Sequence, residues 1–258
     1  MLLCIDIGNT NIKIGLFNGD VMRCRWRIAT DRIRLADEYA MLLINLFAAE
    51  GVKIQEIKGC AIASVVPNLT QVFEEISKRY IGQTPLILQP GVNTGINIRT
   101  DYPEEVGADL IVNALAARHL YGTPAIVVSF GTATTFVAVS KQGDFEGVAI
   151  APGIVTSGES LFRATATLPQ VALARPSSAI GKNTVRSLQA GIVFGFAGLV
   201  EGLVERIKAE LGEDTRVIAT GGLAELIMPE TRVIEAVEPD LALIGLKLLY
   251  ERNQAPDH

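Results

Sequence analysis

Short apolar runs and segments with helical spacing follow one another along most of the chain. A run of roughly four to eight apolar residues bounded by turn residues is typical of a buried strand, whereas apolar residues three and four apart are typical of a helix. Strands are predicted at 2–7, 12–17, 21–28, 59–66, 86–88, 125–130, 133–139, 148–151 and 217–220. Helices are predicted at 36–50, 69–80, 104–121, 154–166, 183–211 and 239–252. This alternation predicts an α/β fold with largely parallel sheets.

The second half of the chain begins with the same pattern as the first. Residues 2–17 hold an apolar run, a polar turn around Gly8 and an alternating strand. Residues 125–139 hold the same three features around Gly131. A repeat of this kind indicates that one supersecondary unit occurs twice in the chain.

The repeat predicts two similar α/β lobes, at residues 1–118 and 119–258. Each lobe is expected to present a phosphate-type turn to a shared cleft. When the two turn glycines are aligned, Ser129 falls on the position of Asp6. The two turns therefore share their backbone pattern but differ in charge.

The first turn carries residue types that suit phosphate and a divalent cation. Asp6 ends the first strand, and Gly8, Thr10 and Lys13 follow it within seven positions. A carboxylate at a strand end suits a hydrated divalent cation, while turn amides, a threonine hydroxyl and a lysine ammonium suit phosphate oxygens. An ordinary hairpin turn explains the same stretch, and the residues alone leave both interpretations open.

Two glycine patterns further along the chain each have two explanations. The glycines of helix 183–211 recur at every third or fourth position and so share one face. Close packing of that face against a neighbouring element is preferred over a ligand role. Gly221 and Gly222 follow strand 217–220, where a glycine pair lets a flat ligand such as a purine lie against the backbone. A plain strand-to-helix turn also explains the pair, and on this stretch alone it is the preferred explanation.

The composition narrows the classes of function. The 258 residues are 49% hydrophobic with a formal net charge of −5, and an acidic chain without a basic block is unsuited to nucleic acid or an anionic membrane. No apolar run reaches the roughly 18 residues that span a bilayer. The cysteines Cys4, Cys24 and Cys60 lack metal-site or disulfide spacing. These features predict a soluble cytoplasmic protein with free thiols and no nucleic-acid or membrane partner.

Six blocks of the sequence occur in the order and spacing of type III pantothenate kinases. The blocks are Asp6-Ile7-Gly8-Asn9-Thr10-Asn11-Ile12-Lys13, Gly107-Ala108-Asp109, Phe130-Gly131-Thr132-Ala133-Thr134-Thr135, Ala151-Pro152-Gly153, Gly181-Lys182-Asn183-Thr184 and Ala219-Thr220-Gly221-Gly222. The chain resembles that family over essentially its whole length. The resemblance implies the actin-like ATPase and sugar-kinase fold, in which two ribonuclease-H-like lobes clamp ATP in the cleft between them.

The resemblance also implies an activity with its cofactors and partners. The family transfers phosphate from ATP to pantothenate, giving 4′-phosphopantothenate, the first step of coenzyme A synthesis. It uses Mg²⁺ or another divalent ion, requires potassium or ammonium, and forms a homodimer. Phosphoryl transfer needs positioning and charge neutralisation more than covalent help, and the residue types of the first turn fit that need.

The resemblance assigns roles to individual residues. The ATP phosphate loop would consist of Asp6, Ile7, Gly8, Asn9, Thr10, Asn11, Ile12 and Lys13, with Asp6 beside the divalent ion. Thr132 would be a second phosphate contact, and Gly221 and Gly222 would lie on the nucleotide side. Asp109 would be the catalytic base that accepts the hydroxyl proton. Substrate would contact Gly107, Ala108, Asp109 and Thr184.

Three positions depart from the family pattern. Leu110 replaces the arginine that follows Gly-Ala-Asp, so the guanidinium that would clamp the substrate carboxylate is missing. Loss of such a charge-assisted contact typically costs a few kcal/mol. Thr100 replaces a tyrosine seven residues before Gly107, and Tyr102 is a candidate substitute. Ser129 replaces an aspartate at the monovalent-cation site, and serine cannot neutralise a cation.

Three functions stay open at the level of the sequence. The first is a working pantothenate kinase with a modified acceptor site. The second is a kinase for another hydroxylated small molecule. The third is a degenerate nucleotide-binding homologue with little or no activity, which pairs with an intact homologue in a hetero-oligomer. Because the acceptor pocket of the family lies near the dimer interface, such a chain would complete or regulate the site of its partner.

Overall fold

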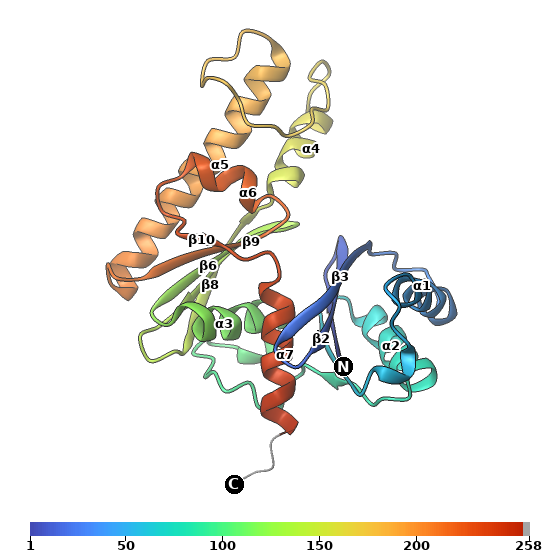
Figure 1. Ribbon diagram of the computed structural model, residues 1–258. Helices are drawn as coiled ribbons and strands as arrows, with labels where there is room; N and C mark the ends of the chain where they lie inside the picture. Colours follow the sequence, from blue (N-terminus) through green and yellow to red (C-terminus); the bar gives the residue numbers. More distant parts are fainter. Residues whose placement is uncertain (255–258) are drawn as a thin grey trace. The chain divides into compact units, whose positions relative to one another are not determined.

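The computed structural model describes residues 1–254 and divides into two compact units (Figure 1). Unit 1 contains residues 1–95, 102–116 and the described part of the segment that begins at Leu241. Unit 2 contains residues 96–101 and 117–240. Both units are layered α/β structures, and each is described by itself below.

Unit 1 is built on a five-stranded sheet with the order β3-β2-β1-β4-β5. Its strands are β1 (Leu2–Ile7), β2 (Asn11–Asn18), β3 (Val21–Ala29), β4 (Gly59–Ser64) and β5 (Leu86–Ile87). Its helices are α1 (Ala36–Ala49), α2 (Pro67–Ile76), the first part of α3 (Ala108–Tyr121) and α7 (Leu241–Gln254). Short turns of other helix types lie at Ile54–Glu56, Ser77–Ile81 and Pro103–Glu105. The antiparallel pairs β1–β2 and β2–β3 and the parallel pairs β1–β4 and β4–β5 confirm the strands predicted for the first half. They form a mixed sheet, however, and not the largely parallel sheet that was predicted.

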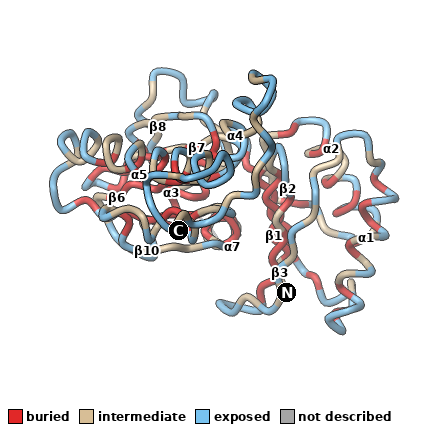
Figure 2. Tube along the Cα trace, turned by 90° about the horizontal axis from the view of Figure 1, so that it is seen from above, coloured by how far each residue is buried: buried red, intermediate tan, exposed pale blue. Residues whose placement is uncertain are grey.

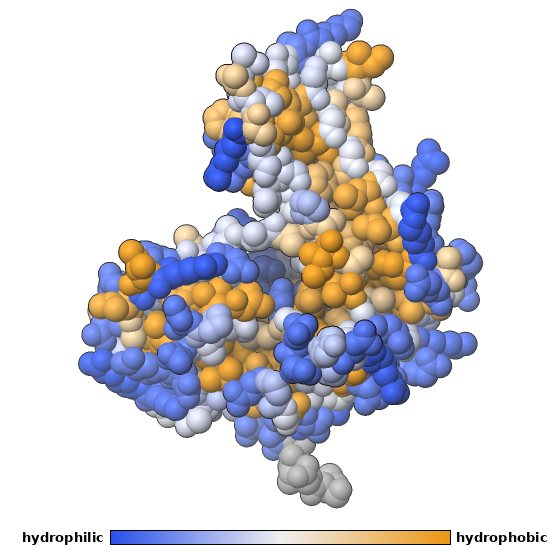
Figure 3. All heavy atoms as spheres, turned by 180° about the vertical axis from the view of Figure 1, so that it is seen from behind, coloured by the Kyte–Doolittle hydropathy of each residue, from blue (hydrophilic) through white to orange (hydrophobic). Residues whose placement is uncertain are grey.

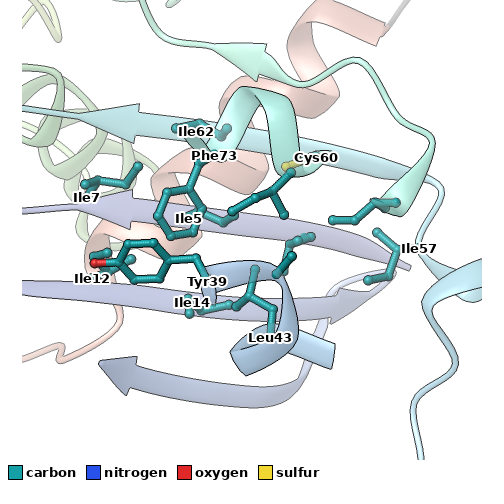
Figure 4. Close-up of a cluster of buried hydrophobic side chains, with 14 of the residues drawn as sticks. Ile5, Ile7, Ile12, Ile14, Tyr39, Leu43, Ile57, Cys60, Ile62 and Phe73 are labelled. Carbon is teal, nitrogen blue, oxygen red and sulfur yellow. The ribbon is translucent and has the colours of Figure 1, made fainter. Parts of the chain in front are cut away.

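One face of this sheet forms the main core of unit 1. Side chains alternate along a strand, so Leu3, Ile5 and Ile7 of β1 share a face and are buried in one cluster. Tyr39 of α1 and Phe73 of α2 pack onto that face, with ring centroids 5.0 Å apart (Figure 4). Burial is concentrated along β1 and β2, while the outer surfaces of α1 and α2 are exposed (Figure 2).

Helix α7 covers the opposite face of the sheet. A Cβ added at Gly15 of β2 would lie 3.0 Å from Leu243 Cδ1, which shows how closely the helix approaches the strands. The helix also crosses α3 at Gly245, where a Cβ would lie 2.0 Å from the carbonyl oxygen of Val112. The last helix of the chain therefore packs in unit 1, because its apolar side chains cover the face that α1 and α2 leave open.

The lobe boundaries predicted from the repeat, a single cut after residue 118, differ from this division of the chain. The boundary inside α3 falls between Ala116 and Ala117, close to the predicted position. However, the residues from 241 belong to unit 1, and residues 96–101 belong to unit 2. The second difference follows from the pairing of Ile98 with Phe145 and from the ion pair between Arg99 and Asp144 at 2.9 Å.

Unit 2 repeats the sheet of unit 1, with the order β10-β9-β6-β7-β8. Its strands are β6 (Ala125–Phe130), β7 (Ala133–Val139), β8 (Phe145–Pro152), β9 (Arg216–Gly221) and β10 (Ala236–Val237). Its helices are the end of α3, α4 (Ile154–Ala164), α5 (Thr184–Leu211) and α6 (Ala224–Ile227), with a short turn at Met228–Glu230. Strands β8, β7, β6, β9 and β10 of unit 2 occupy the positions of β3, β2, β1, β4 and β5 in unit 1. This correspondence confirms the internal repeat. Figure 1 shows α4 and α5 running side by side beyond the sheet.

Two sequence predictions about helices were wrong. Helix α3 begins at Ala108 instead of Glu104, because Gly107 accepts the first helical bonds, from Leu110 N at 3.0 Å and Ile111 N at 3.3 Å. The glycines of α5 do not mediate close packing within this chain. A Cβ at Gly191, Gly195 or Gly198 would meet nothing within 4 Å. Their common face is therefore open in the described structure.

Candidate functional site

The turn between β1 and β2 is a tight hairpin with exposed polar residues. The Gly8 amide donates to the Asn11 carbonyl at 3.1 Å, and Asn9 and Thr10 form the exposed tip. A Cβ at Gly8 would lie 3.0 Å from that same carbonyl oxygen, so a larger residue would crowd the turn. The turn thus presents its polar tip to solvent at the end of two buried strands.

A second segment, after β3, is bonded to this turn. The Thr30 amide donates to the Thr10 carbonyl at 3.0 Å, and its hydroxyl donates to the Gly8 carbonyl at 2.7 Å. Arg32 Nη2 donates to Asn9 Oδ1 at 2.8 Å. Sequence reasoning missed Thr30 and Arg32, because they lie about twenty residues from the turn and only the pairing of β2 with β3 brings them near.

Asp6 is a buried carboxylate beside the turn. It pairs across the strands with Lys13 and is 8% exposed, and its Oδ1 has no hydrogen-bond partner among residues 1–254. Burial raises the pKa of Asp6 to about 6, the nearby Lys13 lowers this pKa, and the charge of Asp109 raises it. The structure therefore places Asp6, Lys13 and Asp109 within electrostatic reach of one another in unit 1.

Asp109 lies in the first turn of α3 and is partly buried. Burial raises the pKa of its carboxyl group, while the backbone amides of Leu110 and of Asp109 itself, together with Lys13, lower it. A Cβ at Gly107 would lie 2.7 Å from Asp109 Oδ1, so the glycine leaves room for the carboxylate. A desolvated carboxylate held by helix N-terminal amides is suited to accept a proton from a neighbouring hydroxyl.

The Asp6 carboxylate fits a divalent cation that also binds phosphate. The unpartnered Oδ1 of Asp6 is a buried acceptor, and a hydrated cation would satisfy it. Within residues 1–254 no group of three or more histidine, cysteine, aspartate or glutamate side chains forms a complete metal site. One or two carboxylates, with the other ligands supplied by water and phosphate, is the usual environment of Mg²⁺ in phosphoryl-transfer enzymes.

The predicted acceptor residues differ in burial. Leu110 is 7% exposed, and its Cγ lies 3.7 Å from the Cβ position of Gly107, so an apolar side chain occupies this place. Thr100 belongs to unit 2, where its Oγ1 is buried without a hydrogen-bond partner. Tyr102 is 63% exposed. Thr184 is the exposed first residue of α5 in unit 2, next to the N-cap Asn183, whose side chain accepts from Arg186 N at 2.9 Å.

The equivalent edge of unit 2 is formed by the ends of β6 and β9. These strands are parallel, and Phe130 pairs with Gly221 at this edge. Gly221 has φ +96°, and a Cβ there would lie 2.4 Å from the Phe130 carbonyl oxygen. Strand packing therefore requires this glycine regardless of any ligand. The turn between β6 and β7 is closed by a hydrogen bond from the Gly131 amide to the Ala133 carbonyl at 3.0 Å. Thr132 is exposed in this turn.

Three hydroxyl side chains form a row across this edge of unit 2. Ser129 of β6 pairs with Thr135 of β7 and with Thr220 of β9, so the three side chains share one face of the sheet. We call these residues the hydroxyl row. The oxygens of both threonines are buried without a partner, and Thr220 is 1% exposed. The row supplies no formal charge, so it does not fit a carboxylate-anchored potassium or ammonium site.

The candidate residues are found in both units, and each group is described within its own unit. Unit 1 holds the first turn together with Asp6, Lys13 and Asp109, and unit 2 holds the hydroxyl row, Thr132 and the glycine pair. The sequence model of the type III pantothenate kinase family matches residues 2–206. The chain belongs to the type III pantothenate kinase family.

Individual relatives agree with this family over nearly the full length. The chain is 53% identical to the type III pantothenate kinase of Moorella thermoacetica over 98% of this chain and 100% of the relative. It is also 53% identical to that of Roseiflexus sp., over 99% of this chain and 100% of the relative. These matches confirm the resemblance that the six sequence blocks predict.

A solved structure agrees with the fold alone. The activator of the 2-hydroxyisocaproyl-CoA dehydratase from Clostridium difficile, solved with bound ADPNP, superposes with a TM-score of 0.58 at 13% identity. The alignment covers 100% of this chain and 98% of the other. The chain therefore shares the α/β fold of this activator, in agreement with the fold that the sequence resemblance implies.

Proposed function

We propose that this chain binds ATP with Mg²⁺ at the first turn and transfers the γ-phosphoryl group to the hydroxyl group of pantothenate. The observation that supports the proposal is the group Asp6, Lys13 and Asp109, which combines a cation-binding carboxylate, an ammonium group and a desolvated base in one unit. Lys13 supplies positive charge for the phosphates, and the exposed turn supplies polar contacts. Mg²⁺, when bound, neutralises phosphate charge and orients the γ-phosphoryl group.

Asp109 is the proton acceptor in this proposal. The pantothenate hydroxyl oxygen forms a bond to the γ-phosphorus while the bond from that phosphorus to the β–γ bridging oxygen breaks. The hydroxyl proton passes to the Asp109 carboxylate, and ADP carries the bridging oxygen away. The raised pKa of Asp109 makes the carboxylate a better proton acceptor than an ordinary aspartate.

Turnover of purified protein with ATP, Mg²⁺ and pantothenate tests this proposal. We expect phosphopantothenate from the wild type and at least about a hundredfold lower kcat from Asp109→Asn, with ATP affinity preserved. The absence of turnover in a wild type that binds ATP would reject pantothenate kinase activity. It would favour the degenerate homologue, as Leu110 supplies no cation for the pantothenate carboxylate. A screen of hydroxylated acceptors would identify a kinase with another substrate.

A homodimer is part of the proposal, and α5 supports it. Helix α5 contains an 18-residue stretch with a mean hydropathy of 1.6, and 28% of that stretch is buried. By length and composition alone, the helix is long and apolar enough to cross a membrane. Exposed apolar side chains lie on α4 and α5 and in the segment between them, among them Leu161, Phe162, Ile180 and Val185. Figure 3 shows apolar side chains gathered over this part of unit 2. A groove of about 470 Å³ runs along Gly191 and Gly195.

A second copy of the chain is the occupant that we propose for this groove, in a soluble cytoplasmic dimer. Light scattering should give twice the chain mass without detergent, and Gly195→Glu should yield monomers with an unchanged far-ultraviolet spectrum. Glu201→Gln, a charge change further along the same helix, serves as the control and should stay dimeric. A monomeric wild type, or a wild type that requires detergent, would contradict the dimer. A dimer formed only with an intact homologue would favour the hetero-oligomer instead.

A further inference from the structure

Arg32 is an exposed cation at the tip of the first turn. Its Nη2 donates to the neutral side-chain oxygen of Asn9 at 2.8 Å. Within the described part of the chain Arg32 takes part in no ion pair, although Asp31 precedes it. The Asp31 Oδ1 instead accepts from the Ile33 amide at 3.1 Å. Within residues 1–254 the positive charge of Arg32 is therefore not neutralised by an ion pair.

Arg34, two residues further on, has a different environment. Its Nε lies 4.0 Å from Asp31 Oδ2, and its guanidinium carbon lies 5.2 Å from the centre of the Tyr39 ring. Arg34 thus places its charge beside a carboxylate and an aromatic face, and among the described interactions none joins it to the turn. The two arginines provide a matched pair for comparison.

The two residues before Arg32, Thr30 and Asp31, are both held by hydrogen bonds. Thr30 makes two hydrogen bonds to the turn, at 3.0 Å and 2.7 Å. The Asp31 amide donates to the Tyr39 hydroxyl at 2.9 Å, and that hydroxyl donates to the Asp31 carbonyl at 3.0 Å. Tyr39 is fully buried in the core of unit 1. This anchoring holds the backbone before Arg32 in place relative to the turn.

We propose that Arg32 is a polyphosphate-binding residue, whose guanidinium exchanges the amide oxygen of Asn9 for anionic oxygens of the bound nucleotide. A charge-assisted hydrogen bond to phosphate is roughly twice as strong as one to a neutral acceptor, and the guanidinium fork can donate twice. This inference rests on the proposed binding of ATP at the first turn.

The charges around the turn give a second reason. Asp6 and Asp109 provide two carboxylates against the single ammonium group of Lys13. With both carboxylates ionised, these three groups carry a net charge of about −1, which opposes a polyphosphate. Arg32 adds one positive charge at the tip of the turn, where it offsets this repulsion of an incoming polyphosphate.

Binding of ATP, ADP and AMP by calorimetry in Mg²⁺ tests the inference. We expect Arg32→Gln to weaken ATP binding about tenfold or more, with a smaller loss for ADP and less than about twofold for AMP. Arg34→Gln, the matched control, should change ATP affinity by less than about twofold. Arg32→Lys should recover part of the loss, because it keeps the charge without the fork.

The dependence of the loss on the ligand separates phosphate binding from a structural role. If Arg32 contacts phosphate, the loss of affinity in Arg32→Gln should increase with the number of phosphate groups, from AMP through ADP to ATP. An equal loss for AMP and ATP would show that Arg32 only shapes the turn and would overturn the inference. Wild-type affinity in Arg32→Gln would also overturn it. A wild type that binds no ATP would reject the proposed function itself.

Discussion

Asp6→Asn should make the protein more stable near neutral pH while it impairs nucleotide binding with Mg²⁺. The Asp6 carboxyl group is 8% exposed, and its Oδ1 lacks a partner. Burial raises its pKa from the ordinary value of 3.8 to about 6. At about 1.4 kcal/mol per pKa unit, this difference corresponds to roughly 3 kcal/mol of unfavourable free energy when the group is ionised. Asparagine has nearly the same shape and carries no charge.

The pH dependence distinguishes this effect from a change in packing. Between about pH 4 and pH 6 the unfolded chain has already released the Asp6 proton while the folded protein still holds it. The folded protein therefore loses stability as pH rises through this window, and the loss levels off above about pH 6. The stability difference between Asp6→Asn and wild type should grow from near zero at pH 4 to about 2–3 kcal/mol at pH 7.

Urea denaturation of both proteins at several pH values measures the difference. Asp101→Asn, at an exposed position, controls for the loss of one negative charge. Titration with ATP and Mg²⁺ at pH 7 should show weaker binding to Asp6→Asn, as expected where function requires a destabilised residue. A stability difference that is constant across the pH range, or an asparagine variant less stable than wild type at pH 7, would refute this account.

Two further predictions concern unit 2. Gly221→Ala should destabilise the protein by about 2–4 kcal/mol in urea denaturation, because its Cβ would lie 2.4 Å from the Phe130 carbonyl at a φ of +96°. Gly147→Ala, where a Cβ meets nothing within 4 Å, should stay within about 1 kcal/mol, and equal losses in the two variants would contradict the packing argument. Ser129→Asp should introduce potassium dependence, since it adds a carboxylate to the hydroxyl row. Kinetics with potassium replaced by a large organic cation measure it, and a wild type as potassium-dependent as Ser129→Asp would contradict the assignment.

The strand framework was predictable because its signals are local and repeated. Apolar runs and alternation within 2–17 and 125–139 predict two hairpins, and the structure contains both. The position of Asp109 near a helix start was also evident from its sequence block. Its pKa was not, because that depends on burial and on Lys13, which lies far away in the sequence.

The errors of the sequence reasoning have identifiable physical causes. Regularly spaced glycines show that one face of a helix lacks side chains. They do not show whether another element of the same chain packs against that face, because this depends on the tertiary structure. Around Gly195 that surface is open in this chain. Conversely, Gly221 has the conformation and the close backbone neighbour that a strand end requires, so its presence needs no ligand. Thr30 and Arg32 are brought to the turn by a β-sheet register that composition does not reveal.

The two sheets repeat the same backbone but differ in charge. In unit 1 the row equivalent to the hydroxyl row consists of Ala63, Asp6 and Lys13, which are paired across β4, β1 and β2. An aspartate and a lysine in this row can neutralise a cation and a phosphate, whereas three hydroxyl groups supply hydrogen bonds but no formal charge. Removal of a charge in unit 1 should therefore change nucleotide binding strongly. Single hydroxyl deletions in unit 2 should each cost only about 0.5–1.5 kcal/mol of binding free energy.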